Sequence, residues 1–296
     1  MSPIASPVRL RRPTGDRAAA AVFVGFDSAW ADNPKAPGAI CSVVFDGDRF
    51  VDFHHPESVG FSQAFAHIER VLRPNLPILV AIDQPTIVPN DKGMRPVDKT
   101  VASLISWIGG GVQPANRGKL AMFGPQAPIW AFKERLAATQ NPEVARTAIR
   151  GVHLMEVFPA LALASFDPQF FGRLAGPRYN PARRKTFRRD DWRAVILCAI
   201  AEAQRCGFHT MVAWLNELHL CENPNKMHQD RLDAAICLLI AIRWRVGARD
   251  ESVVLGDLQT GYMVAPVSSA VMTRLSHDAF ERSVAVNAVG ASGRGA

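Results

Sequence analysis

The stretch AVFVGFD at residues 21–27 is β-branched and aromatic and ends in a carboxylate, which predicts a buried strand. Residues 39–45 and 49–53 have the same character, and the Asp46-Gly47-Asp48 sequence between them is typical of a hairpin turn. The chain is therefore expected to open with three antiparallel strands.

Helical and strand patterns alternate after this opening. Residues 58–72 carry apolar side chains at helical spacing, and residues 78–82 are continuously apolar, as in a strand covered on both faces. Later in the chain we expect a strand at 152–158, helices at 191–206 (capped by Asp190), 211–219 and 227–246, and a terminal hairpin of 252–255 with 261–264. This order predicts an α/β fold with a mixed sheet and helices on its faces.

No repeat period divides the chain, so one domain is expected to account for most of it. We place this domain at residues 18–266, with an insertion of loops and short helices at about 86–140, where Pro and Gly are frequent. Residues 1–17 are expected to be a disordered basic tail, and residues 267–296 a C-terminal helix and tail. A secretion signal is the weaker interpretation of the arginine-rich start, because Asp16 and Arg17 interrupt it.

The composition favours a folded protein that meets polyanions. The chain has 34 basic and 27 acidic residues among 296, a net charge of +7, which makes nucleic acid or a phosphorylated ligand a reasonable partner. Its longest apolar run, residues 234–242, is about half of the roughly 20 residues that cross a bilayer, so no membrane partner is expected. The five cysteines contain no C-x-x-C pair, which favours a reducing cytoplasmic location, and nothing indicates an oligomeric state.

Three predicted strands end in a carboxylate or contain one, at Asp27, Asp83 and Glu156. Ligands bind at the carboxyl ends of parallel strands in α/β sheets. Asp230 and Asp233 lie three residues apart near the start of the last long helix, and so on one face of it. Carboxylates within a few Å of each other repel unless a cation is bound, and hard oxygen ligands suit Mg²⁺ or Mn²⁺. The sequence therefore predicts a divalent-metal site at this edge of the sheet.

Each acid also has a simpler interpretation. Asp83 is close to Pro85 and could be a turn residue, while Asp230 could only complement a helix dipole. Asp233 precedes nine apolar residues and Glu156 alternates with apolar neighbours, so each is either paired in the core or functional.

Three groups of polar side chains are candidates for substrate contacts. Arg95 could contact a substrate phosphate, or it could form a salt bridge with Asp98 that fixes the insertion. Asn116 and Arg117 lie on a loop that could bind substrate or be only a loop. The third group is a basic segment with aromatic neighbours, which suits phosphate contacts with stacking or an ordinary solvated face. The segment carries Arg178, Arg183, Arg184, Lys185, Arg188 and Arg189, interleaved with Tyr179 and Phe187, and its candidate residues are Arg183, Arg184, Lys185 and Arg188.

Motifs along most of the chain resemble the DUF429 family. They are VGFD at 24–27, AIDQP at 81–85, GMRPVD at 93–98, MEVFP at 155–159, DRLDAA at 230–235, and the closing GD at 256–257 with GYMVAP at 261–266. The family is described as predicted nucleases of the ribonuclease H-like superfamily. The order and spacing of the motifs agree better than any single motif does.

The resemblance implies a ribonuclease H-like mixed sheet in which the first and fourth strands lie side by side. It also implies a metal-dependent nuclease, a hydrolase of phosphodiester bonds in RNA, DNA or a hybrid, with two bound Mg²⁺ or Mn²⁺ ions. Asp27 would bridge the ions, Asp83 and Asp233 would complete the site, and Asp230 would be a further ligand. Glu156 would be a fourth catalytic acid, although the commonest superfamily arrangement takes its glutamate from elsewhere.

Two other functions remain open. The chain could be a non-catalytic nucleic-acid-binding protein with a degenerate acid site, in which the basic segment carries the affinity. It could also be an ATP- or phosphoryl-binding member of the same superfamily, although Trp30 stands where phosphate-binding glycines would be needed after Asp27.

Overall fold

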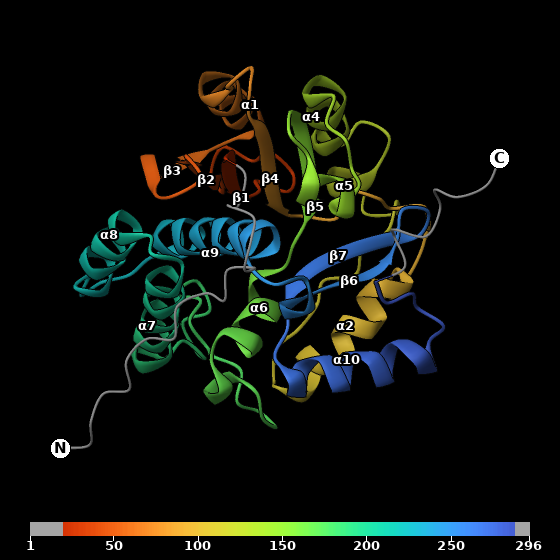
Figure 1. Ribbon diagram of the computed structural model, residues 1–296. Helices are drawn as coiled ribbons and strands as arrows, with labels where there is room; N and C mark the ends of the chain where they lie inside the picture. Colours follow the sequence, from red (N-terminus) through yellow and green to blue (C-terminus); the bar gives the residue numbers. More distant parts are fainter. Residues whose placement is uncertain (1–19, 288–296) are drawn as a thin grey trace.

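The computed structural model describes residues 20–287, and the predicted basic tail at 1–17 lies outside them. Five strands form the main sheet in the order β3-β2-β1-β4-β5 (Figure 1). They are β1 (Ala21–Asp27), β2 (Gly38–Phe45), β3 (Phe50–Val59), β4 (Pro77–Asp83) and β5 (Gly151–Glu156). β2 is antiparallel to β1 and β3, whereas β4 is parallel to β1 and β5. This mixed sheet is consistent with the ribonuclease H-like arrangement, with the first and fourth strands side by side as expected.

Helices cover both faces of the sheet (Figure 1). On one face, α1 (Phe61–Val71) and α4 (Pro128–Leu136) share an apolar cluster with β1 residues such as Val24. On the other face, α9 (Lys226–Val246) packs against β1, β2 and β4. The outer helices on this side are α6 (Pro159–Phe166), α7 (Arg189–Cys206) and α8 (His209–His219). Every residue of β1 is buried, because successive side chains of a strand point to opposite faces and both faces are covered.

Gly25 allows α9 to lie close against β1. A side chain at this position would overlap the carbonyl oxygen of Ala234. The same oxygen accepts a hydrogen bond from the thiol of Cys41 on β2, with 3.4 Å between Sγ and O. This close approach brings the first turns of α9 to the carboxyl end of β1, where Asp27 lies.

A second layer lies beside the β5 edge of the sheet. It contains α2 (Pro96–Trp107), the hairpin of β6 (Ser252–Asp257) and β7 (Gly261–Pro266), and α10 (Ser269–Glu281). These elements share one apolar cluster, so the predicted insertion and the C-terminal region pack on each other. A bridge between Val157 and Val264 joins the hairpin to the main sheet. The shorter elements are α3 (Leu120–Phe123), α5 (Pro142–Thr147) and two single turns of 3₁₀ helix at Pro168–Phe170 and Arg249–Glu251.

Three local predictions differ from the structure. The helix expected from residue 58 begins at Phe61, because β3 continues to Val59 and pairs with β2 along this stretch. The strand expected to reach residue 158 ends at Glu156, and Pro159 begins α6, which the sequence analysis did not predict. The cap of α7 is Arg188, so Asp190 lies inside the first turn, where its charge complements the helix dipole.

Two expectations drawn from composition concern membranes and cysteines. Among residues 20–287, no helix has the length and hydropathy needed to span a membrane. All five cysteines are free thiols, and Cys41, Cys198 and Cys237 are buried.

Candidate functional site

Asp27 and Asp83 are register partners at the carboxyl ends of the parallel strands β1 and β4. Adjacent strands lie about 4.8 Å apart, so the two carboxylates share one edge of the sheet. Asp27 is buried and Asp83 is partly buried. The sheet thus places these two acids side by side, which is the arrangement that the strand pattern predicts.

Helix α9 adds Asp230 and Asp233 to the same place. Both acids are buried in the first turns of the helix, which the side chain of Asn225 caps by accepting a hydrogen bond from the backbone N–H of His228. Burial raises the pKa of Asp27, and the negative charges of Asp233, Asp83 and Asp230 raise it further, so all four carboxylates lie near one another. We refer to Asp27, Asp83, Asp230 and Asp233 as the acid cluster.

The helix acids of the cluster are paired with protein donors. Asp233 Oδ1 accepts a hydrogen bond of 2.8 Å from the Tyr179 hydroxyl, and its Oδ2 accepts one of 2.5 Å from Gln229 Nε2. Asp230 forms an ion pair with Lys226, one turn earlier in α9. By contrast, the strand acids Asp27 and Asp83 accept no side-chain hydrogen bond from any of residues 20–287.

The protonation of the cluster reflects burial and mutual repulsion. Burial, followed by the neighbouring carboxylates, raises the pKa of both Asp27 and Asp83 well above their usual values. Burial also raises the pKa of Asp233 to about 6, although Lys226 and the hydrogen bonds from Tyr179 and Gln229 act to lower it. The Lys226 ammonium lowers the pKa of Asp27 and of Asp83 as well. Within the described residues, one ammonium is set against four carboxylates, so the net negative charge favours a further cation.

The donor chemistry of the cluster fits a hard divalent cation. Asp27 and Asp83 present carboxylate oxygens that no described side chain pairs with, and such oxygens are the ligand type that Mg²⁺ and Mn²⁺ prefer. Asp233 is held by two donors, yet a carboxylate has about four lone-pair sites, so it can accept these bonds and still ligate. Within the described part of the chain, no group of three or more His, Cys, Asp or Glu side chains is already arranged to hold an ion.

Glu156 belongs to a different arrangement, a buried ionic anchor formed with Arg95 and Asp98. Arg95 Nη2 donates to Glu156 Oε1 at 2.5 Å and to Asp98 Oδ1 at 2.7 Å. All three side chains are at most 1% exposed. Gly261 of β7 leaves the space that Arg95 fills, because a Cβ there would lie 2.8 Å from Arg95 Nη1. The anchor therefore joins the insertion, the end of β5 and the terminal hairpin.

This anchor changes the interpretation of two candidate residues. Glu156 raises the pKa of Asp83, so it lies near the cluster, but both of its oxygens bind Arg95. Arg95 has no exposed surface with which to contact a substrate phosphate. The salt bridge with Asp98 is thus the interpretation of Arg95 that the structure supports.

The candidate residues of the loop and of the basic segment differ in whether their side chains are free to contact a substrate. Asn116 Nδ2 donates to the Gly93 carbonyl at 2.8 Å and Arg117 Nε donates to the Val88 carbonyl at 3.0 Å, so both hold neighbouring loops. The basic residues of the next segment, Arg183, Arg184, Lys185 and Arg188, are all exposed. Its aromatic residues are not available for stacking, because Tyr179 binds Asp233 and Phe187 packs against the core.

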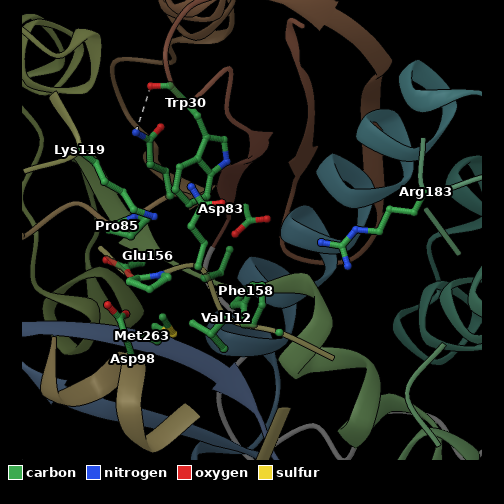
Figure 2. A pocket seen from close by; sticks show the side chains of 15 residues that line it. Trp30, Asp83, Pro85, Asp98, Val112, Lys119, Glu156, Phe158, Arg183 and Met263 are labelled. Carbon is green, nitrogen blue, oxygen red and sulfur yellow. Dashed lines mark hydrogen bonds between the residues drawn. The ribbon is translucent and has the colours of Figure 1, made fainter. Parts of the chain in front are cut away.

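A cavity of about 580 Å³ opens beside Asp83 (Figure 2). Trp30 lies on one wall, and Lys119 and Arg183 approach from opposite sides. The floor contains the anchor acids Asp98 and Glu156. The remaining lining residues are Gln84, Pro85, Gly111, Val112, Gln113, Pro114, Val157, Phe158 and Met263. The cavity thus connects the acid cluster with the insertion.

The residues that support the cluster are not among those predicted from the sequence. Lys226 and Gln229 stand four residues before Asp230 and Asp233, a helical spacing that could have identified them as partners. Tyr179 carried no such signal, because it lies 54 residues from Asp233 and meets it only through tertiary packing.

Comparison with known proteins identifies a family model that covers the part of the chain containing these features. A family model described as "Protein of unknown function (DUF429)" matches residues 25–259. The match contains the acid cluster, Arg95, Asp98 and Glu156. No curated protein and no solved structure matches the chain.

Proposed function

The chain belongs to the DUF429 family, and we propose that it is a metal-dependent phosphodiesterase that hydrolyses nucleic acid. One observation carries the proposal. Asp27 and Asp83 lie in register on adjacent parallel strands, and neither side chain has a hydrogen-bond or ion-pair partner within residues 20–287; both pKa values are raised and Asp233 lies beside them. Such a group of acids is costly to keep unless it binds cations.

The residues of the cluster have separate roles in this proposal. Asp27 and Asp83 bind Mg²⁺ or Mn²⁺, with Asp27 shared if two ions are held. A bound divalent ion lowers the pKa of an attacking water and stabilises charge on the phosphate and its leaving oxygen. Tyr179 and Gln229 orient Asp233, as second partners of ligating carboxylates do. Lys226 offsets part of the negative charge while Asp230 fixes its position.

The surface charge supports a polyanionic substrate. The exposed basic segment at 183–188 follows Tyr179 closely in the chain, so the Tyr179–Asp233 hydrogen bond places it beside the cluster. Together with the net charge of +7, this raises the local concentration of nucleic acid and makes association sensitive to salt.

The test is cleavage of labelled single-stranded, duplex and branched DNA and RNA by the pure protein, in Mn²⁺ or in EDTA. We expect metal-dependent cleavage that falls by about 100-fold or more in Asp27→Asn and Asp83→Asn. Asp250→Asn, which changes an exposed acid outside the cluster, should cut like the wild type. Cleavage that persists in EDTA or in Asp27→Asn would contradict the proposal. Salt-sensitive binding without any cleavage would instead favour a non-catalytic nucleic-acid-binding protein.

A further inference from the structure

We propose that the cavity beside Asp83 receives one unpaired nucleotide of the substrate, with its base against Trp30 and its flanking phosphates near Lys119 and Arg183 (Figure 2). The inference rests on the proposed function, because it names the unit of the substrate that is presented to the acid cluster for hydrolysis. Its own observations concern the cavity, its stacking wall and its two cationic sides.

The size of the cavity suits a single nucleotide. Sites for small molecules occupy about 300–1,000 Å³ and bury most of the ligand, and this cavity of about 580 Å³ lies within that range. A base that remains paired cannot enter such a pocket, so proteins with pockets of this kind act on single strands or extrude a base from a duplex. The substrate is therefore unpaired at the site that is cut.

Trp30 is held in place as a wall of the cavity. Its backbone adopts a left-handed conformation, with φ of 48°, which is uncommon for a bulky residue and needs support. The Trp30 N–H donates to Ser28 Oγ at 3.3 Å, the Ser28 hydroxyl donates to Gln84 Oε1 at 2.5 Å, and Gln84 Nε2 donates to the Trp30 carbonyl at 3.4 Å. Ser28 and Gln84 directly follow the strand acids Asp27 and Asp83. The backbone of Trp30 is thus fixed relative to the acid cluster, and its indole packs edge-on against Phe123, with 5.9 Å between the ring centroids.

The rest of the cavity favours an aromatic ligand. Pro85, Phe158, Val112 and Met263 supply apolar surface on the other sides of the pocket. A base between the Trp30 indole and this surface would gain stacking and burial, and stacking on an aromatic side chain tolerates any base. The pocket therefore selects an unpaired nucleotide rather than a particular sequence.

Charge decides which way the nucleotide faces. The floor holds the carboxylates of Asp98 and Glu156 with one guanidinium between them, so it repels a phosphate. Lys119 and Arg183 border the cavity on opposite sides, and among residues 20–287 neither side chain has a hydrogen-bond or ion-pair partner. One unpaired cation on each side matches the two phosphates that flank an extruded base. The base therefore points inward and the phosphodiesters lie at the rim, beside Asp83.

The experiment measures binding of small probes by titration calorimetry, in Mg²⁺ and in EDTA. The probes are adenosine 3′,5′-bisphosphate, AMP, adenosine and ribose 5-phosphate. We expect affinity to fall in steps as phosphates or the base are removed. Trp30→Ala should weaken AMP about tenfold and leave ribose 5-phosphate unchanged, because only the base contacts the indole. Trp30→Phe, which keeps an aromatic face, should retain most of the affinity and controls for misfolding.

The chain offers a matched control for the cations. Arg183 and Arg184 are adjacent, exposed and equally charged, but only Arg183 borders the cavity. Arg183→Ala and Lys119→Ala should each reduce the affinity of the bisphosphate to about that of AMP, while Arg184→Ala should not. Equal losses in Arg183→Ala and Arg184→Ala would overturn the inference, as would the same affinity for AMP and ribose 5-phosphate.

The two proposals can fail separately. Metal-dependent cleavage by a protein that binds none of these probes would leave the nuclease proposal standing and remove the nucleotide pocket. Binding with the expected dependence on Trp30 and Arg183, but without cleavage of any nucleic acid, would leave the pocket standing and remove the nuclease.

Discussion

A Cβ atom added to Gly25 would lie 2.1 Å from the carbonyl oxygen of Ala234 and 2.5 Å from the amide nitrogen of Leu238. The backbones of β1 and α9 are therefore in direct contact, two residues before Asp27 and one residue after Asp233. The separation between the strand acids and the helix acids is set by the absence of a side chain.

Gly25→Ala should consequently displace α9 and disturb the acid cluster. Because backbone atoms cannot give way as a flexible side chain can, we expect a loss of about 3 kcal/mol in the free energy of unfolding, measured with urea. Gly111→Ala is the control, since a Cβ there meets nothing within 4 Å. A Gly25→Ala variant as stable as Gly111→Ala would show that the helix does not depend on this contact.

Asp27→Asn should stabilise the protein while it removes activity. The folded-state pKa of Asp27 is raised above the unfolded value, so the folded state binds more protons between the two and stability falls as pH rises through this interval. In EDTA at about pH 8, far above the unfolded-state pKa, we expect the amide to add about 1–2 kcal/mol to the free energy of unfolding.

The gain from Asp27→Asn should disappear below about pH 3.5, where the carboxyl is protonated in both states. Asp250→Asn should change stability little at either pH, because Asp250 is exposed. Lower stability of Asp27→Asn at the higher pH would mean that the carboxylate has a stabilising partner, and would contradict the description of the cluster.

Tyr179→Phe should move the acid limb of the pH profile of cleavage to higher pH. The Tyr179 hydroxyl lowers the pKa of Asp233, which stands at about 6, so its removal raises that pKa and a higher pH is then needed to deprotonate the ligand. Tyr262→Phe is the control, because the Tyr262 hydroxyl is also buried but donates to the Leu154 carbonyl. Equal shifts in both variants would indicate a general effect on the fold.

Arg95→Met should destabilise the protein rather than weaken substrate binding. Removing one partner of a buried ionic network leaves uncompensated charge, here on Glu156 and Asp98, at a cost of about 3–5 kcal/mol. The exposed pair of Arg49 with Asp46 provides the comparison, since Arg49→Met should cost less than about 1 kcal/mol. The two losses in the free energy of unfolding are to be measured by denaturant unfolding. A stable Arg95→Met variant that binds nucleic acid poorly would restore the phosphate-binding interpretation.

The strand-end acids could be located from the sequence, because parallel strands end at one edge and a carboxylate directly after an apolar run marks that edge. This holds for Asp27 and Asp83, and helical spacing added Asp230 and Asp233. The same pattern could not separate Glu156 from them, because its partner Arg95 lies 61 residues away and no local signal connects the two. A carboxylate after an apolar run thus indicates the position of an acid in the sheet, but the cationic side chain with which it pairs is determined by the tertiary fold.

The substrate contacts were harder to predict for a similar reason. A run of arginines in the sequence shows that a segment is charged, but not which of its side chains face a binding site. Among the candidate residues of the basic segment, only Arg183 borders the cavity. In the sequence, Trp30 argues only against a phosphate loop, because its indole stands where the backbone after Asp27 would have to approach a phosphate. Its position as a cavity wall follows from hydrogen bonds to Ser28 and Gln84, and the Gln84 side chain comes from another strand end.

The contact between β1 and α9 also determines when the acids meet during synthesis. Asp27 and Asp83 leave the ribosome early, whereas Asp230 and Asp233 follow some 150 residues after Asp83, and Gly261, which makes room for Arg95, comes later still. Domains fold as units once their parts have been made. Until residue 233 has been synthesised, a nascent chain therefore carries only the strand acids of the cluster, without their partners on α9.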